Sequence, residues 1–345
     1  MNNIEIKILD NKHIKNLIDL IKRCYGMTYF YKNFYCENYI KNMIDSNIIK
    51  AITAVNSNNQ IIGHITLFKN EVIGNVGLVG VRDRCFLGEP AMLMIDPNYR
   101  KQGIANRLIT YLLNNLNLFD KNLKGLFCPP ISKHIYSQLL MYKNGFRDCG
   151  CLIGYYPKIS LNHLNNNNQR TSLLLMYLPI NMKGVKIIYL PPVYKDIIKY
   201  IFNNIKINVI YVEDKNYMDN ISYNKYSSFY IKIHKNLGNA NIVVKFFGND
   251  FLSKIKSILK ILIYKDNIKS VLLFLSLNVI ESSIYIESLI NIGFVFAGVL
   301  PDTTVGEALI LQYINVEVLD IDDIKCFSEE SKYILKYIKK YISIK

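Results

Sequence analysis

The sequence predicts a mixed α/β protein in which helices flank a central, mostly antiparallel sheet and the whole unit occurs twice. Three observations lead to this fold class. Short apolar segments typical of strands alternate along the chain with segments whose apolar residues recur at helical spacing. The 345 residues exceed the usual size of one domain, so two domains are expected. The second half also repeats the order of elements of the first, which indicates an internal duplication.

The first half begins with a strand at residues 4–9. Asp10 follows as a helix cap, and the next apolar residues recur at helical spacing. A tyrosine-rich segment covers residues 25–39, and a second helix runs to about residue 44. The remaining expected elements are strands at 49–55 and 61–68 around a hairpin turn, a strand or inserted loop at 71–85, a strand at 91–95, a helix at 103–116, a strand at 125–128, a helix at 133–143, a strand at 146–156, an asparagine-rich loop at 161–170 and a strand at 171–178.

The internal repeat is seen by comparing NLKGLFCPPISKHIYSQLLMYKNGF, which starts at Asn122, with NIKSVLLFLSLNVIESSIYIESLINIGF, which starts at Asn267. Both contain a strand, a short break, an amphipathic helix and Gly-Phe. Residues 173–181 match 308–316, and residues 242–262 stand where 92–112 stand in the first half. We therefore expect a first domain at 1–182 and a degenerate copy at 183–345.

The bulk composition favours anionic partners. Lys and Arg total 42 against 27 for Asp and Glu, a net charge of +15. Coding drift toward lysine is the alternative source of this charge, since Ile, Asn and Tyr are also abundant and Trp is absent. No nucleic-acid-binding signature accompanies the charge, so a nucleic-acid partner is not predicted.

The cysteines and the apolar runs indicate the compartment. The seven cysteines are an odd number with scattered spacing and no CxxC, so neither a disulfide framework nor a metal site is predicted. The N-terminus lacks the layout of a signal peptide, and the apolar runs are too interrupted by charge to span a membrane. We expect a cytoplasmic protein, with a homodimer left open.

The segment DPNYRKQGIANRL, residues 96–108, joins an apolar strand to a helix. The first amides of a helix have no internal partner and lie at the positive end of the helix dipole, so they can bind a phosphate. The small residues Gly103 and Ala105 would let a phosphate approach the backbone, and Arg100 and Lys101 add positive charge. The segment fits neither the Walker loop nor the dinucleotide-binding glycine motif.

This segment resembles the GNAT superfamily of acyl-CoA-dependent N-acyltransferases, which carries [RQ]-x-x-G-x-[GA] after a strand ending in hydrophobic-x-Pro. Residues 95–105 match that pattern, and the order of elements in residues 1–180 matches as well. The resemblance implies a site for acetyl-CoA as co-substrate. Its pyrophosphate would lie on Arg100, Lys101, Gln102, Gly103, Ile104 and Ala105, and its pantetheine arm would pair with the backbone of Leu93, Met94 and Ile95 as an added strand. A backbone amide where the sheet splays would stabilise the oxyanion.

The resemblance also implies catalytic residues. An alkyl ammonium has a pKa near ~10.4 and must lose a proton before it attacks a thioester, and a carboxylate commonly acts as the base. Glu89, which enters the motif strand, is the candidate; the alternative is a solvated turn residue. The family often places a tyrosine four residues before Gly-Phe, where it acts as the acid that protonates the departing thiolate. This chain has Met141 at that position. Tyr142, one residue out of register, is the candidate acid, and Tyr136 is the second choice.

Other residues near the expected site have open alternatives. His134 and Ser137 share a helix face and could line the acceptor or pantetheine pocket, or be ordinary surface residues. Tyr29, Tyr31 and Tyr35 could contact substrate or simply pack. Cys128, Cys149 and Cys151 are expected to pack as small apolar residues.

The sequence therefore predicts an acetyl-CoA-dependent N-acetyltransferase. It would transfer acetyl to a primary amine of a small-molecule or peptide acceptor by direct attack in a ternary complex. The alternative is a catalytically weak or inactive acetyl-CoA-binding regulatory module. The basic tail at residues 328–345 is expected to form an amphipathic helix that docks on the body.

Overall fold

The structure is a computed structural model that describes residues 4–29, 31–69, 86–158, 169–181, 184–213, 225–316 and 319–342. It divides into two compact units, Met1–Cys128 and Pro129–Lys345, called unit 1 and unit 2 below. Each unit is described by itself.

Unit 1 contains a sheet with the strand order β1-β2-β3-β4-β5, in which only β4 and β5 are parallel neighbours. Its elements are β1 (Glu5–Ile8), α1 (Ile14–Tyr25), α2 (Glu37–Asp45), β2 (Ile49–Val55), β3 (Ile61–Lys69), β4 (Leu87–Ile95), α3 (Ile104–Asn114), α4 (Leu116–Phe119) and β5 (Gly125–Cys128).

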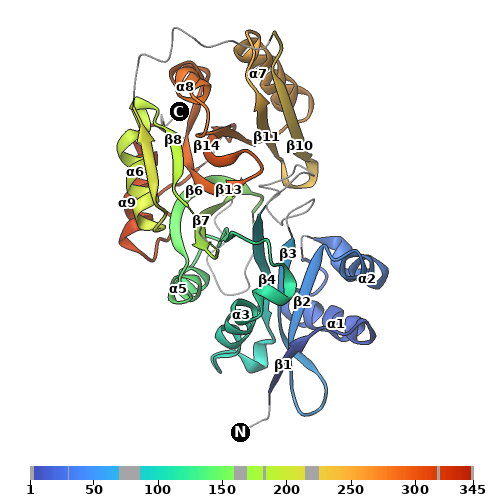
Figure 1. Ribbon diagram of the computed structural model, residues 1–345. Coiled ribbons are helices and arrows are strands. Elements are labelled where there is room, and N and C mark those ends of the chain that lie inside the picture. Colours follow the sequence, from blue (N-terminus) through green and yellow to red (C-terminus); the bar gives the residue numbers. More distant parts are fainter. Residues whose placement is uncertain are drawn as a thin grey trace. The chain divides into compact units, whose positions relative to one another are not determined.

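Helices cover both faces of this sheet. The apolar stripe of α1 and the inner residues of α2 pack with Phe68, Met92 and Met94 on one face, and α3 lies on the opposite face (Figure 1). A side chain at Gly63 of β3 would lie 3.0 Å from Ile104 of α3, so the glycine lets α3 approach the sheet closely. This close packing holds the start of α3 against the end of β4.

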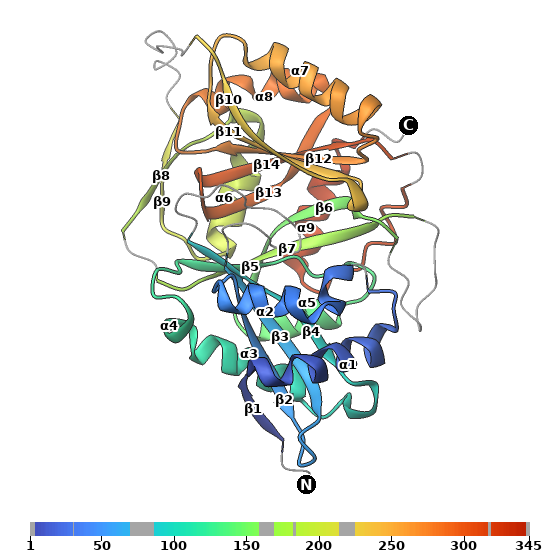
Figure 2. The same cartoon turned by 90° about the vertical axis from the view of Figure 1, so that its right-hand side faces the viewer.

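Unit 2 contains a larger sheet with the order β7-β6-β13-β14-β12-β11-β10 and a separate parallel pair, β8-β9. Its helix α8 packs on β13 and lies beside α7 (Figures 1 and 2), and α6 and α9 pack on β6 and β13. The elements are α5 (Tyr136–Lys143), β6 (Arg147–Tyr156), β7 (Thr171–Pro179), β8 (Lys186–Tyr189), α6 (Lys195–Asn204), β9 (Val209–Val212), β10 (Ser228–His234), β11 (Asn239–Phe246), α7 (Phe251–Lys260), β12 (Ser270–Ser276), α8 (Glu281–Ile292), β13 (Phe294–Thr303), β14 (Gly306–Ile314) and α9 (Glu329–Lys339).

Strands β6 and β13 meet at a pair of glycines. Gly150 pairs with Gly298, and a Cβ built on Gly150 would lie 2.5 Å from the carbonyl oxygen of Ala297. Beyond this contact the side chain of Gln312 takes the place of a strand neighbour, because its amide accepts from the Ile153 N–H at 2.9 Å and donates to the Ile153 carbonyl at 2.6 Å. Two small residues thus permit a backbone approach that no larger residue would allow.

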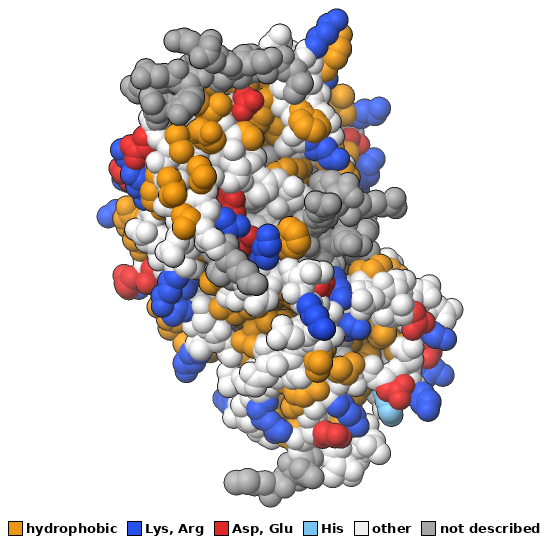
Figure 3. Space-filling view, viewed as in Figure 1, with side chains coloured by type: hydrophobic (Ala, Val, Ile, Leu, Met, Phe, Trp, Pro, Cys, Tyr) orange, Lys and Arg blue, Asp and Glu red, His pale blue; other side chains and the backbone are white. Residues whose placement is uncertain are grey.

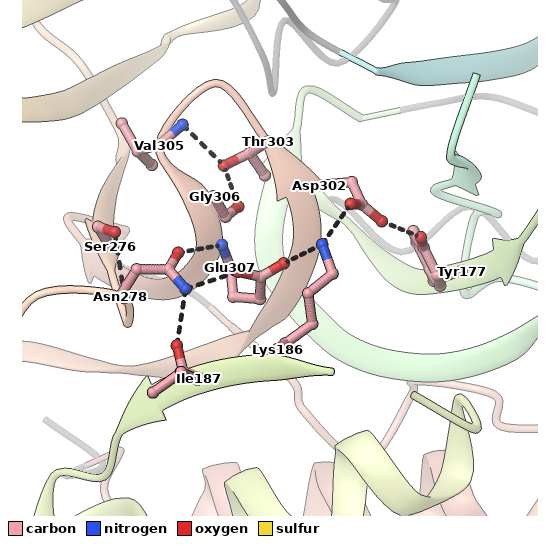
Figure 4. A network of polar contacts seen from close by, with 10 residues as sticks. All are labelled: Tyr177, Lys186, Ile187, Ser276, Asn278, Asp302, Thr303, Val305, Gly306 and Glu307. Atoms are coloured by element: carbon pink, nitrogen blue, oxygen red, sulfur yellow. Dashed lines mark hydrogen bonds and ion pairs between the residues drawn. The ribbon is translucent and has the colours of Figure 1, made fainter. Parts of the chain in front are cut away.

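A polar cluster lies where β13 ends and β14 begins (Figure 4). Lys186 Nζ of β8 lies 2.8 Å from Asp302 and 2.8 Å from Glu307, and Tyr177 donates to Asp302 at 2.7 Å. Asn278 donates to the second oxygen of Glu307 at 2.7 Å. Burial disfavours the charge of Lys186, but the two carboxylates outweigh it and hold the pKa of this lysine above its ordinary value.

The fold class predicted from the sequence is confirmed: helices flank a mixed, mostly antiparallel sheet in each unit. The motif strand begins at Leu87, earlier than the expected residue 91, and helix α5 begins at Tyr136, later than the expected residue 133. The expected segment at 71–85 and most of the loop at 161–170 lie outside the described residues. The predicted domain boundary at 182/183 stays a prediction.

Strand pairing follows the same order in two series of elements, the first from β3 to β7 and the second from β10 to β14. In the first, β3 and β4 are antiparallel, β5 is parallel to β4, and β6 and β7 are antiparallel. In the second, β10 and β11 are antiparallel, β12 is parallel to β11, and β13 and β14 are antiparallel. Helices α3 and α5 stand in the first series where α7 and α8 stand in the second. This correspondence supports the duplication, which itself stays a prediction.

The C-terminal tail forms the expected amphipathic helix. Ser328 caps α9 by accepting from the Ser331 amide at 2.9 Å, and Ile334, Leu335 and Ile338 are buried. The helix contacts β6 and β13, so it docks on unit 2 as expected. None of the described helices combines the length and the apolar character needed to cross a bilayer.

The charged side chains do not gather into one basic patch on the face shown in Figure 3. Lys and Arg side chains are scattered there among acidic and uncharged ones. On this face the positive charge is therefore dispersed rather than focused.

Candidate active site

The turn after β4 is held in place by Asp96, whose side chain is buried. Its Oδ2 lies 2.6 Å from Arg23 Nε of α1, and its Oδ1 accepts from the Asn98 amide at 3.0 Å. Arg23 also donates to the Ile61 carbonyl at 2.6 Å, and the Tyr99 hydroxyl accepts from Asn56 at 3.0 Å. These bonds tie the turn to α1 and β3, so the loop that follows starts from a fixed position.

The loop from Arg100 to Gly103 is exposed, and it leads directly into α3. Lys101 and Gly103 both have left-handed backbones, with φ of 61° and 74°, and Gly103 is the N-cap of α3. A Cβ added to Gly103 would meet nothing within 4 Å. Ile104 is buried, which anchors the helix, while Ala105 is half-buried.

The amides of this loop are available to an anion. In the described part of the chain, the amides of residues 101–105 donate to no backbone carbonyl, and regular helix bonding starts with Arg107, which donates to Gly103 at 3.1 Å. The positive end of the α3 dipole adds to their attraction. With Arg100 and Lys101 alongside and the space over Gly103 open, the loop fits the pyrophosphate of acetyl-CoA.

Strand β4 leaves one of its edges open beside this loop. It pairs with β5 only at Leu87 and Gly88, and beyond Gly88 no described strand pairs with that edge. On its other edge β4 carries a bulge, because Met92 and Leu93 together face a single residue of β3, and Met92 has φ of 53°. The backbone of Leu93, Met94 and Ile95 can therefore accept an extended ligand as an added strand.

Glu89 lies on β4 at the start of this open stretch. It pairs across the sheet with Phe68 and is 1% exposed, so it is a strand residue rather than the solvated turn residue that was its alternative. It interacts electrostatically with Tyr29 in the segment between α1 and α2. Burial first, and then neighbouring groups that include Glu89, raise the pKa of Tyr29 well above its ordinary value.

The tyrosine-rich segment forms a packed layer over this face. Tyr29 contacts Tyr25 with ring centroids 5.0 Å apart and Tyr31 at 6.0 Å. The Tyr35 hydroxyl donates to the Gly26 carbonyl at 2.7 Å and accepts from the Tyr29 amide at 3.1 Å. These contacts fix the positions of Tyr29, Tyr31 and Tyr35. Within this layer, Tyr29 is the residue that interacts with Glu89.

Two buried polar residues of β3 were missed by the sequence prediction. His64 Nε2 lies 2.7 Å from the Thr66 hydroxyl, which in turn lies 4.0 Å from the sulfur of Met92 at the bulge. Burial lowers the pKa of His64 to about 3, so the ring is neutral at physiological pH. The signal was available, since one histidine interrupts the apolar strand IIGHITLF.

Tyr142 and Tyr136 belong to unit 2. The Tyr142 ring lies between Arg147, whose guanidinium carbon is 4.2 Å from the ring centroid, and Phe327, whose ring centroid is 5.5 Å away. Tyr142 is thus packed between two side chains, and its buried neighbour Met141 holds the family position. Tyr136 is 74% exposed and tilts against His134 at 5.5 Å.

The remaining candidates of unit 2 are buried or half-buried. Burial lowers the pKa of His134 and raises the pKa values of Cys149 and Cys151 well above the ordinary range. The two thiols are therefore protonated core residues, as expected. Among the described residues, no group of His, Cys, Asp and Glu side chains is arranged to hold a metal ion.

The place in unit 2 that corresponds to the loop is already filled by protein groups. At the start of α7, the Asp250 carboxylate accepts from the Ser227 amide at 2.6 Å, and the Gly248 amide donates to the Ser227 hydroxyl at 2.8 Å. The Lys254 ammonium beside Asp250 holds the pKa of that carboxyl near 2. β11 and β12 are paired over five residues, from Asn239 to Val243, whereas β4 and β5 are paired over only two.

Solved structures with a related arrangement include spermidine N-acetyltransferase from Vibrio cholerae in complex with CoA and spermine. It is 17% identical, with a TM-score of 0.38 over 51% of this chain and 95% of that chain. The spermidine/spermine N-acetyltransferase SpeG from Vibrio cholerae in complex with manganese ions is also 17% identical, with a TM-score of 0.37 over 51% of this chain and 92% of that chain. Both are too distant to bear on the substrate of this protein. No curated protein matches the sequence.

A family model provides the firmer comparison. The acetyltransferase (GNAT) family matches residues 14–126, which cover α1 to β5, with the exposed loop and the open edge of β4 among them. The match covers less than half of the chain and lies wholly within unit 1. Residues 14–126 therefore form an acetyltransferase domain of the GNAT family, for which acetyl-CoA is the acyl donor.

Proposed function

We propose that this protein transfers the acetyl group of acetyl-CoA to a primary amine of a small-molecule or peptide acceptor, by direct attack in a ternary complex. The observation that carries the proposal is the arrangement on β4. One strand presents a buried carboxylate at Glu89 and an open backbone edge at Leu93 to Ile95, and it leads into the exposed loop at Gly103. Donor site and base thus share one short element.

The donor site follows from the loop and the strand edge. The amides of residues 101–105 and the side chains of Arg100 and Lys101 would bind the pyrophosphate. The edge of β4 would hold the pantetheine arm, because an open strand edge offers alternating N–H and C=O groups. Acetyl-CoA supplies the thioester carbonyl at which the new bond forms.

Glu89 would act as the general base. The acceptor arrives as an ammonium ion with a pKa near ~10.4, and its nitrogen has no lone pair until a proton is removed. A carboxylate fixed on β4 can take this proton, directly or through a water molecule. The amine nitrogen then bonds to the acetyl carbon, the carbon–sulfur bond breaks, and CoA leaves as the thiol. The tyrosine layer around Tyr29 would shape the acceptor side.

Tyr142 remains the proposed source of the proton for the departing thiolate. Its packing against Arg147 and Phe327 limits the motion of the ring. Met141 cannot supply a proton, so without Tyr142 or Tyr136 the proton would come from water.

The second half would be a degenerate copy that does not bind acetyl-CoA. Two features support this: the Asp250 carboxylate lies where an incoming pyrophosphate would need positive potential, and β11 and β12 pair over five residues where β4 and β5 pair over two. A like charge at a helix N-terminus opposes an anion.

The proposal is tested with the full-length protein. Acetyl-CoA is titrated calorimetrically, and free-thiol release is then followed against polyamines, aminoglycosides and peptide N-termini. We expect binding together with amine-dependent thiol release. Binding without release against any acceptor class would instead identify an acetyl-CoA-binding regulatory module.

Glu89→Gln tests the base directly. We expect kcat to fall by about 10²–10⁴-fold while acetyl-CoA affinity is retained, because the amide cannot accept the proton. Glu287→Gln, an exposed change on α8, should leave kcat unchanged. An active Glu89→Gln enzyme with an unaltered pH–rate profile would remove Glu89 from the mechanism.

A further inference from the structure

Unit 2 contains a cavity that acetyl transfer does not explain. Its volume is about 660 Å³, within the roughly 300–1,000 Å³ typical of small-molecule sites. It lies between the start of α5, the segment before α9, and α9 itself. It is lined by His134, Ile135, Tyr136, Ile324, Lys325, Cys326, Lys332, Leu335, Lys336 and Lys339.

The cavity has an apolar lining that is open to water. Ile135 and Tyr136, at the start of α5, are 39% and 74% exposed. Ile324 and Leu335 lie deeper, at 8% and 7% exposed. Exposed apolar surface next to a buried apolar floor favours a ligand with an apolar body.

Lysines border this apolar surface. Lys332 is paired with Glu329 at 2.7 Å, and Lys339 is paired with Asp322. Lys325 and Lys336, which are both exposed, form no ion pair with any described residue. The lining itself contains four lysines and no carboxylate; two of these lysines are paired with acids outside the lining, and two remain.

The other titratable groups of the lining add no negative charge. Burial lowers the pKa of His134, which keeps the ring neutral near pH 7, and burial raises the pKa of Cys326, which keeps the thiol protonated. The lining itself presents lysines and no carboxylate, which disfavours a cationic ligand.

The wall that carries Lys325 is held in place. The Lys325 amide donates to the Ser132 carbonyl at 2.8 Å, and its carbonyl accepts from Gln138 at 2.8 Å. The same buried Gln138 side chain accepts from the Phe327 amide at 2.8 Å. The cavity is therefore formed before a ligand arrives, which lowers the entropic cost of binding.

We propose that this cavity binds a small organic anion with an apolar body, of the class of medium-chain fatty carboxylates. The carboxylate would lie between Lys325 and Lys336, and the chain would cover Ile135 and Leu335. An inorganic anion would leave the apolar lining exposed, and a neutral lipid would leave the two ammonium groups unused. The site is independent of the proposed acetyl transfer, so either proposal can fail alone.

Octanoate is the probe, titrated calorimetrically into the full-length protein. We expect saturable binding of one octanoate per chain, with no binding of octylamine or acetate. Lys325→Met and Lys336→Met should each weaken octanoate binding at least about tenfold, the loss of one charge-assisted contact. Ile135→Ser should weaken it as well. Lys256→Met, an exposed lysine change on α7, is the matched control and should have no effect.

Three results would overturn the proposal. Binding of octylamine as tight as that of octanoate would mean that the cavity is merely apolar. An equal loss of octanoate affinity in Lys256→Met would mean a general charge effect. Binding of a polyglutamate peptide in place of octanoate would identify a docking site for an acidic chain. Thermal unfolding of each variant checks that the fold is intact.

Discussion

Gly103 is the residue on which the proposed donor binding most depends. Its left-handed backbone starts α3, and no atom lies within 4 Å of the position a Cβ would occupy. Arg100 and Lys101 add charge, but only a residue without a side chain leaves the helix amides open to a phosphate. We therefore expect this one position to separate a pyrophosphate site from an ordinary strand-to-helix corner.

We predict that Gly103→Glu weakens acetyl-CoA binding at least about 100-fold, because a carboxylate placed at the pyrophosphate site costs several kcal/mol. Gly184→Glu is the matched control, since Gly184 has φ of 79° and equally open surroundings. Both variants carry the same backbone strain, so only the first should lose affinity in calorimetry. Equal losses would show that strain, not the site, is measured.

Asp148 of β6 carries a prediction about pH. Burial, opposed by the hydrogen bond from Ser328, raises the pKa of Asp148 from 3.8 to about 6. The folded protein thus binds this proton more tightly than the unfolded chain does. The contribution of Asp148 to the free energy of unfolding is therefore fully present below about pH 4 and is lost as the pH rises through about 6.

Asp148→Asn should remove this dependence. We compare the free energy of unfolding of the variant with that of the parent. The difference in favour of the variant should be larger at pH 7 than at pH 4 by up to about 3 kcal/mol, the equivalent of about two pKa units. Urea unfolding at several pH values measures the difference. Asp19→Asn, an exposed change on α1, should follow the parent profile. A parent whose stability rises from pH 4 to pH 6 while Asp148→Asn behaves identically would contradict the assignment.

At the scale of elements, β4 is decisive because its two edges differ. One edge is paired with β3 through the bulge at Met92, and the other is open beyond Gly88. A bulge bends the strand and increases its twist, which helps β4 to diverge from β5. The buried pair His64 and Thr66 lies next to this bulge and supports its shape from β3.

The cluster that joins β8 to β13 and β14 gives an element-scale prediction. Lys186→Met would leave Asp302 and Glu307 buried without a counter-charge, and we expect a loss of about 2–4 kcal/mol in urea unfolding. Lys195→Met breaks an exposed pair with Glu213 and should cause no measurable change. A Lys186→Met protein as stable as its parent would mean that the cluster contributes only specificity.

At the scale of the whole molecule, the two series of elements differ in the loop and the strand pairing that the proposed donor site uses. Gly150 and Gly298 stand at equivalent places in the repeat, four residues after the Phe of each Gly-Phe, and they pair with each other. This pairing of equivalent positions is what the predicted duplication would produce. The two series share a pairing order, but among the described residues the β4–β5 pairing is shorter than the β11–β12 pairing, and the exposed loop with Gly103 follows β4.

We therefore predict one acetyl-CoA per chain, measured as the calorimetric stoichiometry. Gly103→Glu should abolish all binding, since the start of α7 is occupied by Asp250. A second binding event in the parent, or a residual site in Gly103→Glu, would show that the second half also binds the donor.

Much of the fold could be predicted because it depends on local patterns. Helix α1 follows from its apolar stripe, the hairpin of β2 and β3 from its turn residues, and the loop at Gly103 from its small residues between a strand and a helix. The burial of Glu89 could not be predicted, since Gly-Glu-Pro reads locally as a turn. His64 was missed because a single polar residue does not change the period of an apolar strand.

The sequence by itself predicted the order of elements, the repeat and a phosphate site at residues 100–105, because each prediction rests on residues close together along the chain. The tertiary structure decided what depends on contacts between distant residues. It buried Glu89 beside Tyr29, packed Tyr142 between Arg147 and Phe327, opened β4 beyond Gly88, and formed the lysine-bordered cavity from α5 and α9. Burial and strand separation arise from packing, which local sequence patterns do not specify.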